Sequence, residues 1–165
     1  MKKNKKWILY IAAAAVLVFI WTNSMQDQAH SVAASNSLKE FILAKLSFFV
    51  DDNSRLMTFI QTYIRKCAHF IEFTLLGAVL MTILTINKKT SVQNIYNIFS
   101  FSVIVAVIDE FVQRYTGRGP NVKDVVIDSV GSLFGIFLVF DIYWISVFIR
   151  YMSKKRKSQQ KILKQ

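Results

Sequence analysis

Three short runs in this sequence combine ionisable side chains with apolar surroundings. The first extends from Arg65 to Phe73 and contains two cations, a histidine and a carboxylate. Two later runs add more acids: Asp109-Glu110-x-x-Gln113 and Asp124-x-x-x-Asp128. Because an unpaired charge is costly in hydrocarbon, ionisable residues in apolar helices are expected to pair with one another or to serve a function. We therefore expect the three runs to meet in one polar site.

Two kinds of chemistry fit this set of residue types. In a headgroup site, cations would bind phosphate and carboxylates would bind amines or hydroxyls. In an enzyme that acts on a lipid-linked substrate, a histidine or a carboxylate would act as general base or nucleophile. The candidate catalytic residues are His69, Glu72, Asp109, Glu110 and Asp124. The candidate ligand-binding residues are Arg65, Lys66, Gln113, Arg118 and Asp128.

A metal site and a purely structural role are the alternatives. His69-x-x-Glu72 is an i, i+3 pair to which the later carboxylates could add oxygen ligands. Such a pair is frequent by chance and no cysteine or second nearby histidine supports it, so no metal ligand is assigned and the cofactor is left open. In the structural alternative, the charges form an ion-pair network that only fixes helix packing. The sequence has no serine-hydrolase elbow, P-loop, His-Glu-x-x-His or dinucleotide-binding motif.

Four long apolar stretches must position these runs. They cover roughly residues 7–25, 67–86, 92–113 and 124–148 in a chain that is 53% hydrophobic. Each is close to the roughly 20 apolar residues with which a helix spans a bilayer. The lysine-rich start also resembles a signal peptide, but a small-residue cleavage site comes only at Val32-Ala33-Ala34, so we expect an uncleaved first span. The expected fold is an all-α integral membrane protein with four transmembrane helices.

Helical spacing predicts which side chains share a face. One face of the third stretch carries Ser102, Ala106, Asp109 and Gln113. One face of the fourth carries Asp124, Asp128, Gly131 and Gly135, in which the two glycines have the spacing of a helix-packing surface. We favour packing within one chain over homodimerisation for that surface. Between the first two spans, an interfacial amphipathic helix is predicted from the spacing of Leu38, Phe41, Ile42, Leu46 and Phe49.

The positive charge is concentrated at one predicted side of the membrane. Thirteen of the 21 Lys and Arg residues lie in the N-terminal segment, the turn at Lys88 and Lys89, and the segment after Ile149. Cytoplasmic loops carry such an excess, so both termini are predicted to be cytoplasmic and the polar site to be near the outer face. Nucleic-acid binding is not needed to explain the net charge of +11. The single cysteine, Cys67, excludes a disulfide within the chain and is expected to be a small buried apolar residue.

The polar runs and their order resemble the VanZ-like family of membrane proteins. The resemblance rests on the following blocks: Ser24-x-Gln26, Lys66-x-x-His69-Phe70-x-Glu72-Phe73-x-x-Leu76-Gly77, Asp109-Glu110-x-x-Gln113, Arg118, and Asp124-x-x-x-Asp128-x-x-Gly131. It implies a four-helix membrane domain over residues 1–150, followed by a basic cytoplasmic tail over residues 151–165. In the family pattern the position of Asp128 is usually Asn, so this chain carries an additional carboxylate there.

The resemblance also implies a setting for the protein. The family takes its name from a protein linked to reduced susceptibility to the glycopeptide teicoplanin. The implied location is the bacterial cytoplasmic membrane. The implied partners are a membrane lipid or lipid-linked cell-wall precursor, with a glycopeptide antibiotic as a further candidate. The oligomeric state is left open.

Overall fold

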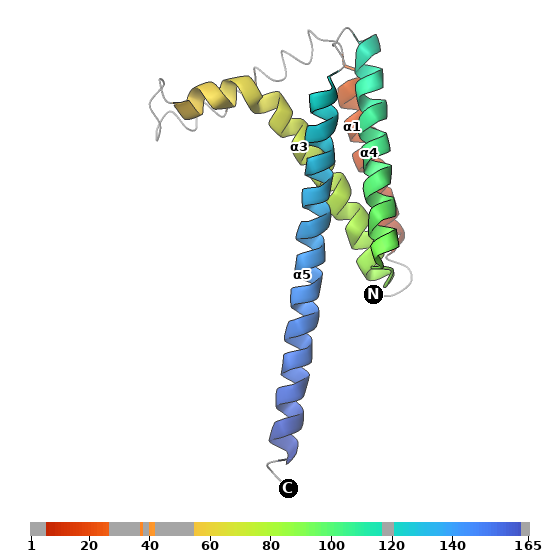
Figure 1. The fold of residues 1–165 in the computed structure, drawn as a ribbon, viewed down its shortest axis with the longest axis vertical. Coiled ribbons are helices and arrows are strands. Elements are labelled where there is room, and N and C mark those ends of the chain that lie inside the picture. Colours follow the sequence, from red (N-terminus) through yellow and green to blue (C-terminus); the bar gives the residue numbers. More distant parts are fainter. Residues whose placement is uncertain (1–5, 27–36, 38–39, 42–54, 117–120, 163–165) are drawn as a thin grey trace.

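The structure is a computed structural model that describes residues 6–26, 37, 40–41, 55–116 and 121–162. Four long helices follow one another in this part of the chain (Figure 1): α1 (Trp7–Ser24), α3 (Arg55–Ile86), α4 (Val92–Tyr115) and α5 (Val122–Ile162). No described residue belongs to a strand. The interfacial helix expected around Leu38–Phe49 lies almost entirely outside the described residues and stays a prediction.

Each of the four helices contains a segment long and apolar enough to cross a membrane. These segments are Trp7–Ser24, Lys66–Ile86, Val92–Tyr115 and Val122–Arg156, close to the four predicted stretches. Most of their side chains point away from the interior of the bundle, and Phe111, Phe137 and Ile145 are more than half exposed. A large contiguous apolar exterior is unfavourable in water but suits a surface that faces lipid. The expected class, an all-helical protein with four helices of membrane-spanning length, is confirmed.

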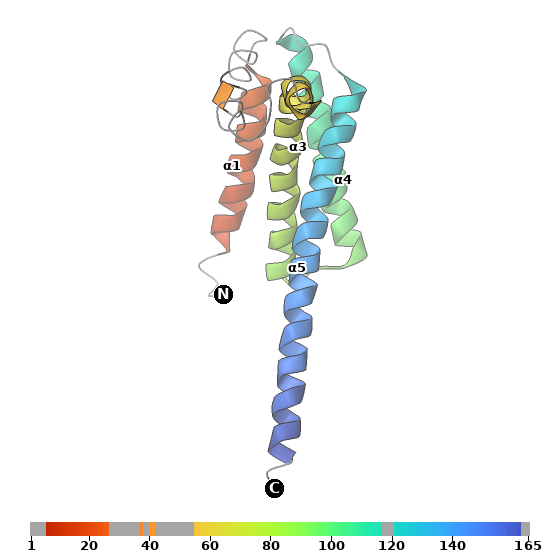
Figure 2. The same cartoon turned by 90° about the vertical axis from the view of Figure 1, so that its left-hand side faces the viewer.

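Polar contacts fix which helix ends lie together. The Lys6 ammonium donates a 2.9 Å hydrogen bond to the side-chain oxygen of Asn87, so the start of α1 lies beside the end of α3. At the other end, the Thr116 hydroxyl donates to the backbone carbonyl of Ser24 at 3.3 Å, which joins the end of α1 to the end of α4. The helices therefore alternate in direction, and all three polar runs fall at this second end of the bundle (Figure 2).

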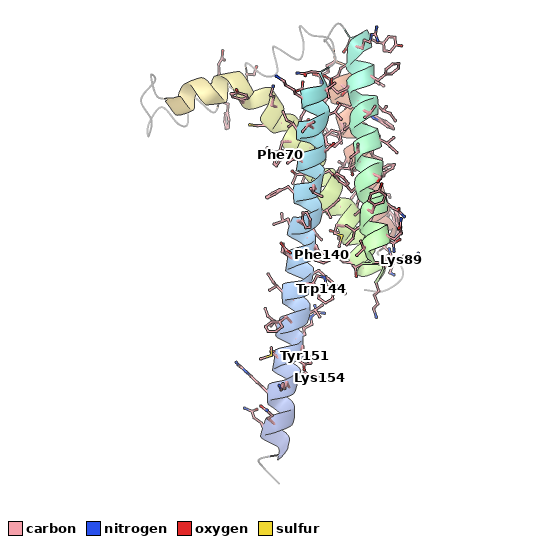
Figure 3. All side chains as sticks on the ribbon, in the orientation of Figure 1. Phe70, Lys89, Phe140, Trp144, Tyr151 and Lys154 are labelled. Carbon is pink, nitrogen blue, oxygen red and sulfur yellow. The ribbon has the colours of Figure 1, made fainter. Side chains whose placement is uncertain are left out.

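Two helices extend beyond the bundle. The first turns of α3 project sideways at the polar end, which Figure 2 shows end-on. At the opposite end α5 continues without a break through the basic segment to Ile162. Figure 3 shows Tyr151 and Lys154 on this projecting part. The residues after Arg150, which the sequence indicated only as a basic tail, thus prolong the last helix.

Helices α3 and α5 pack so closely that their backbones almost touch. A Cβ atom built on Gly77 would lie closer than 3.0 Å to backbone atoms of Ser132, and one on Gly131 would lie 2.5 Å from the Phe70 carbonyl oxygen. A Cβ on Gly135 would likewise meet the Thr74 carbonyl oxygen. The predicted glycine surface of α5 is therefore confirmed as a packing face within the chain, where small residues allow close approach.

Substitution of Gly135 tests this packing. Gly135→Leu would drive a side chain into the backbone of α3, and we expect it to lower the free energy of unfolding by about 3 kcal/mol, the upper range for overpacking. The matched control is Val130→Leu, on the exposed face of the same helix. Thermal unfolding of both variants in detergent measures the difference, and equal midpoints would contradict the close helix contact.

Candidate functional site

The three polar runs meet inside the bundle at its polar end. Their interior side chains are largely excluded from solvent: Glu72 is 8% exposed, Asp109 0%, Glu110 5%, Gln113 2% and Asp128 0%. The faces predicted from helical spacing are confirmed for α4, because Ser102, Ala106, Asp109 and Gln113 are all buried. The cluster thus holds four buried carboxylates, a composition that a membrane protein keeps only where the charges are compensated.

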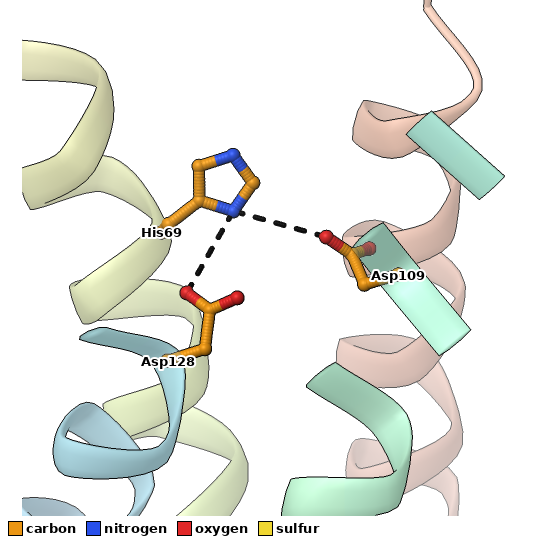
Figure 4. Close-up of side chains that lie close together, drawn as sticks. All are labelled: His69, Asp109 and Asp128. Atoms are coloured by element: carbon orange, nitrogen blue, oxygen red, sulfur yellow. Dashed lines mark ion pairs between the residues drawn. The ribbon is translucent and has the colours of Figure 1, made fainter. Parts of the chain in front are cut away.

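His69 lies between two of these carboxylates. Its Nδ1 atom is 3.9 Å from Asp109 Oδ2 and 3.9 Å from Asp128 Oδ1 (Figure 4). The three side chains come from α3, α4 and α5, so the site exists only when these helices are packed together. The histidine side chain is itself only 13% exposed. This arrangement can hold a proton or a cation between its two acids.

Hydrogen bonds orient Asp109 from two sides. The Ser24 hydroxyl of α1 donates to Oδ1, and the Gln113 amide, one turn further along α4, donates to Oδ2 at 2.8 Å. Both carboxylate oxygens therefore accept a hydrogen bond, and the group is fixed with Oδ2 toward His69. Gln113, a predicted ligand-binding residue, acts here by positioning Asp109.

Asp128 differs from Asp109 in its surroundings. Both of its carboxylate oxygens are buried, and neither accepts a hydrogen bond from a described residue. A buried polar group without a hydrogen-bond partner costs about 1–3 kcal/mol, and more when it is charged. The distance of 3.9 Å to His69 is too long for a hydrogen bond. The described residues therefore bury the Asp128 carboxylate but donate no hydrogen bond to it.

Glu72 and Glu110 connect helices at the edge of the cluster. The side-chain amide of Asn23 in α1 donates to Glu72 Oε1 at 2.7 Å. The backbone N–H of Asn121, just before α5, donates to Glu110 Oε2 at 2.9 Å. These contacts cross between helices, so both glutamates, predicted as catalytic candidates, also serve to hold the bundle together.

Lys66 and Asp124 form an ion pair at the rim of the cluster. Lys66 Nζ lies 3.8 Å from Asp124 Oδ1, and the two side chains are 37% and 28% exposed. The Lys66 ammonium also lies 5.9 Å from the centre of the Tyr63 ring, within range of a cation–π contact. Of the predicted ligand-binding residues, Arg118 and the side chain of Arg65 lie outside what the structure describes.

The first helix contributes a wall of the site that the polar runs alone did not predict. Asn23 and Ser24 of α1 each donate to a buried carboxylate, of Glu72 and Asp109 respectively. The available signal was their position directly after an apolar stretch, together with the place of Ser24 in the family pattern. α1 is apolar around its whole circumference, so spacing could not indicate which side faces the other helices.

An apolar groove adjoins the rim between α3 and α5. It has a volume of about 720 Å³, and its walls include Phe70, Ile71, Val126 and Ile127. Two cations, Lys66 and Lys123, also line it.

Cys67 is a further wall residue of this groove. The expectation that it would be buried was wrong, because it is exposed. Apolar character in a membrane helix is compatible with a lipid-facing position as well as with the core. The groove therefore contains the one thiol of the chain, within reach of reagents.

Comparison with known proteins assigns the chain to a family. No curated protein and no solved structure matches it significantly. A family model described as VanZ/LLP1 matches residues 7–149, nearly the whole chain. The matched region includes the first three apolar segments, most of the fourth and every residue of the buried cluster. The resemblance drawn from the sequence blocks is confirmed, and the chain belongs to the VanZ/LLP1 family.

Proposed function

We propose that this protein binds a phosphate-bearing lipid or lipid-linked cell-envelope precursor in the groove between α3 and α5, beside the buried acid cluster. The observation that carries the proposal is the combination of an apolar groove with two lysines that line it. Lys66 belongs to both regions, because it lines the groove and pairs with Asp124 of the cluster.

The groove suits a molecule with a hydrocarbon chain and an anionic head. Its volume of about 720 Å³ falls in the range of ligand pockets, about 300–1,000 Å³. Lysine ammonium groups bind phosphate as compact point charges. The Lys66–Asp124 distance of 3.8 Å exceeds the roughly 2.7–2.9 Å of a direct charge-assisted hydrogen bond. The Lys66 ammonium is therefore not tightly held by Asp124, and a phosphate can compete for it.

The distribution of cations supports an outward-facing site. Lys89, in the turn after α3, and Lys154, on the projecting part of α5, lie at or beyond the end of the bundle opposite the cluster. By the positive-inside rule that end belongs in the cytoplasm, which would put the groove in the outer leaflet of the cytoplasmic membrane. Lipid-linked wall precursors and glycopeptides of the teicoplanin type meet there, and lowered susceptibility to such antibiotics is the cellular consequence that we propose.

Acid–base chemistry on the bound lipid is the second candidate function. It is favoured by the position of His69 between two buried carboxylates, since a histidine with an oriented carboxylate partner is a common general base. Under this alternative the protein would be a lipid-phosphate hydrolase or transferase.

Native Cys67 provides a direct assay for groove occupancy. We expect an isoprenoid monophosphate in neutral nanodiscs to slow maleimide labelling of Cys67, and the corresponding alcohol to slow it much less. Lys66→Gln combined with Lys123→Gln should weaken the phosphate effect by about tenfold or more, which corresponds to about 1.4 kcal/mol. Lys154→Gln, at the far end of α5, is the control. Equal protection by phosphate and alcohol, or full protection in the double variant, would refute the headgroup site.

Turnover separates binding from catalysis. The same nanodiscs can be incubated with radiolabelled isoprenoid phosphate and extracted for chromatography. Under the catalytic alternative, dephosphorylated or transferred product should accumulate, and His69→Gln should abolish it while Cys67 protection persists. Absence of any product alongside saturable protection would leave the protein as a binding protein.

The orientation has a separate test. In a Cys67→Ser background, a cysteine introduced at Asn121 should react with a membrane-impermeant maleimide added to intact cells. A cysteine introduced at Lys154 should react only after permeabilisation. The reverse pattern would place the acid cluster at the cytoplasmic face.

A further inference from the structure

Three side chains from three helices converge on one small volume at the centre of the cluster. One nitrogen of His69 and one oxygen each of Asp109 and Asp128 all lie within 4.8 Å of one another. We propose that these three residues bind a single divalent transition-metal cation. This inference goes beyond lipid binding and does not depend on it.

The set differs from the one that sequence spacing indicated. The candidate ligand pair His69-x-x-Glu72 is not part of the set, because Glu72 points to α1 and accepts a hydrogen bond from Asn23. Glu110 accepts a hydrogen bond from the backbone of Asn121, and Asp124 pairs with Lys66 at the rim. Packing of the helices therefore selects Asp109 and Asp128 from the available acids.

The state of Asp128 is the independent observation that points to a ligand. Its side chain is fully buried and faces His69 (Figure 4), and neither oxygen accepts a hydrogen bond from the described part of the chain. Buried charges in proteins are paired or coordinate metals, since an isolated ionised carboxylate is very unfavourable in an apolar interior. A cation of charge +2 would neutralise Asp109 and Asp128 together, with a neutral imidazole as third ligand.

The spacing of the donor atoms fits a bound cation after a small contraction. Metal–ligand bonds to imidazole nitrogen and carboxylate oxygen are about 2.0–2.2 Å long, so two ligands of one ion lie about 3–4 Å apart. His69 Nδ1 is 3.9 Å from each carboxylate oxygen. Those separations are too long for hydrogen bonds yet close to the spacing of ligands around one ion.

Asp109 also has the outer contacts that metal-binding carboxylates usually have. Ser24 and Gln113 donate to its two oxygens, which fixes the carboxylate relative to His69. Ligating groups are commonly held by such hydrogen bonds, which orient them and tune their affinity. One imidazole with two carboxylates suits Zn²⁺ or Mn²⁺ better than Mg²⁺ or Ca²⁺, which prefer oxygen alone. Three protein ligands would leave a coordination position open.

Metal binding can be measured directly, without lipid. Full-length protein is purified in detergent, stripped with a chelator and titrated with Zn²⁺, Mn²⁺ and Mg²⁺ separately. Bound metal is quantified by mass spectrometry after removal of free ion, and Co²⁺ supplies an absorption spectrum that reports ligand geometry. We expect saturation at one Zn²⁺ or Mn²⁺ per chain and a higher melting temperature with metal, because a ligand that binds only the folded state stabilises it.

Asp128→Asn is the decisive variant, and Asp124→Asn is its matched control on the same helix. Loss of a metal-ligating carboxylate should weaken binding by at least about 100-fold, the upper range for changes even to outer contacts. Asp124→Asn should bind like the parent protein. Because Asn has nearly the same shape as Asp, the Asp128→Asn variant also distinguishes a metal-ligand role of Asp128 from a purely structural role. Metal-free Asp128→Asn should melt at or above the temperature of the metal-free parent, since it removes a buried like charge, whereas a purely structural ion pair with His69 predicts a lower temperature.

The results that would overturn the proposal are clear-cut. Absence of saturable binding of any of the three ions by the parent protein would refute it. Undiminished affinity in both Asp128→Asn and His69→Gln would also refute it. Lys66→Gln should retain metal binding, so failure of the lipid proposal and failure of the metal proposal produce different outcomes.

Discussion

Close contact between the backbones of α3 and α5 is the constraint on which the rest of the structure depends. Gly131 packs against Phe70, and Gly135 packs against Thr74, which fixes both the distance and the register of the two helices. Asp128 precedes Gly131 by one turn, and His69 precedes Phe70 by one residue. A register fixed at the glycines therefore brings Asp128 beside His69. The same contact sets the spacing between the walls of the lateral groove, so both proposed sites derive from it.

The buried charges divide into two groups by the way in which they are compensated. Glu72 and Glu110 accept hydrogen bonds that cross between helices, which is what a structural polar network would provide. Asp109 likewise accepts a hydrogen bond from Ser24 of α1, but Asp128 accepts none from the residues described. The structural role considered from the sequence thus accounts for Glu72 and Glu110, while Asp128 beside His69 is the place where we propose a bound cation.

The sequence predicted the helices and much of the cluster because two simple physical signals were strong. Apolar length identified the four spans, and the helical period put Asp109 on the same face as Ser102, Ala106 and Gln113. The contribution of α1 could not be predicted, since a helix that is apolar all round gives no preferred face. The position of Cys67 was misjudged for a related reason: lipid-facing and core-facing residues are equally apolar. Which of the acids lie beside His69 depends on the register between helices, and residue spacing within a single helix gives no information about that register.

The length of α5 was also not evident from apolar character. Lys, Arg and Gln are good helix formers, and no glycine or proline interrupts the chain after Gly135. The helix can therefore persist after its apolar part ends. The change from apolar to basic residues at Arg150 predicts where the membrane-spanning segment ends, but α5 continues to Ile162.

This continuity has a mechanical consequence. Forty-one residues at about 1.5 Å each make a rod about 60 Å long, roughly twice the thickness of a bilayer's hydrocarbon core. Asp128 sits near one end of the rod and the basic turns around Lys154 near the other. A rod without a hinge transmits any axial shift or tilt of one end to the other. In the proposed orientation, attraction between its basic turns and anionic headgroups would therefore set the depth of the acid cluster and the groove in the opposite leaflet.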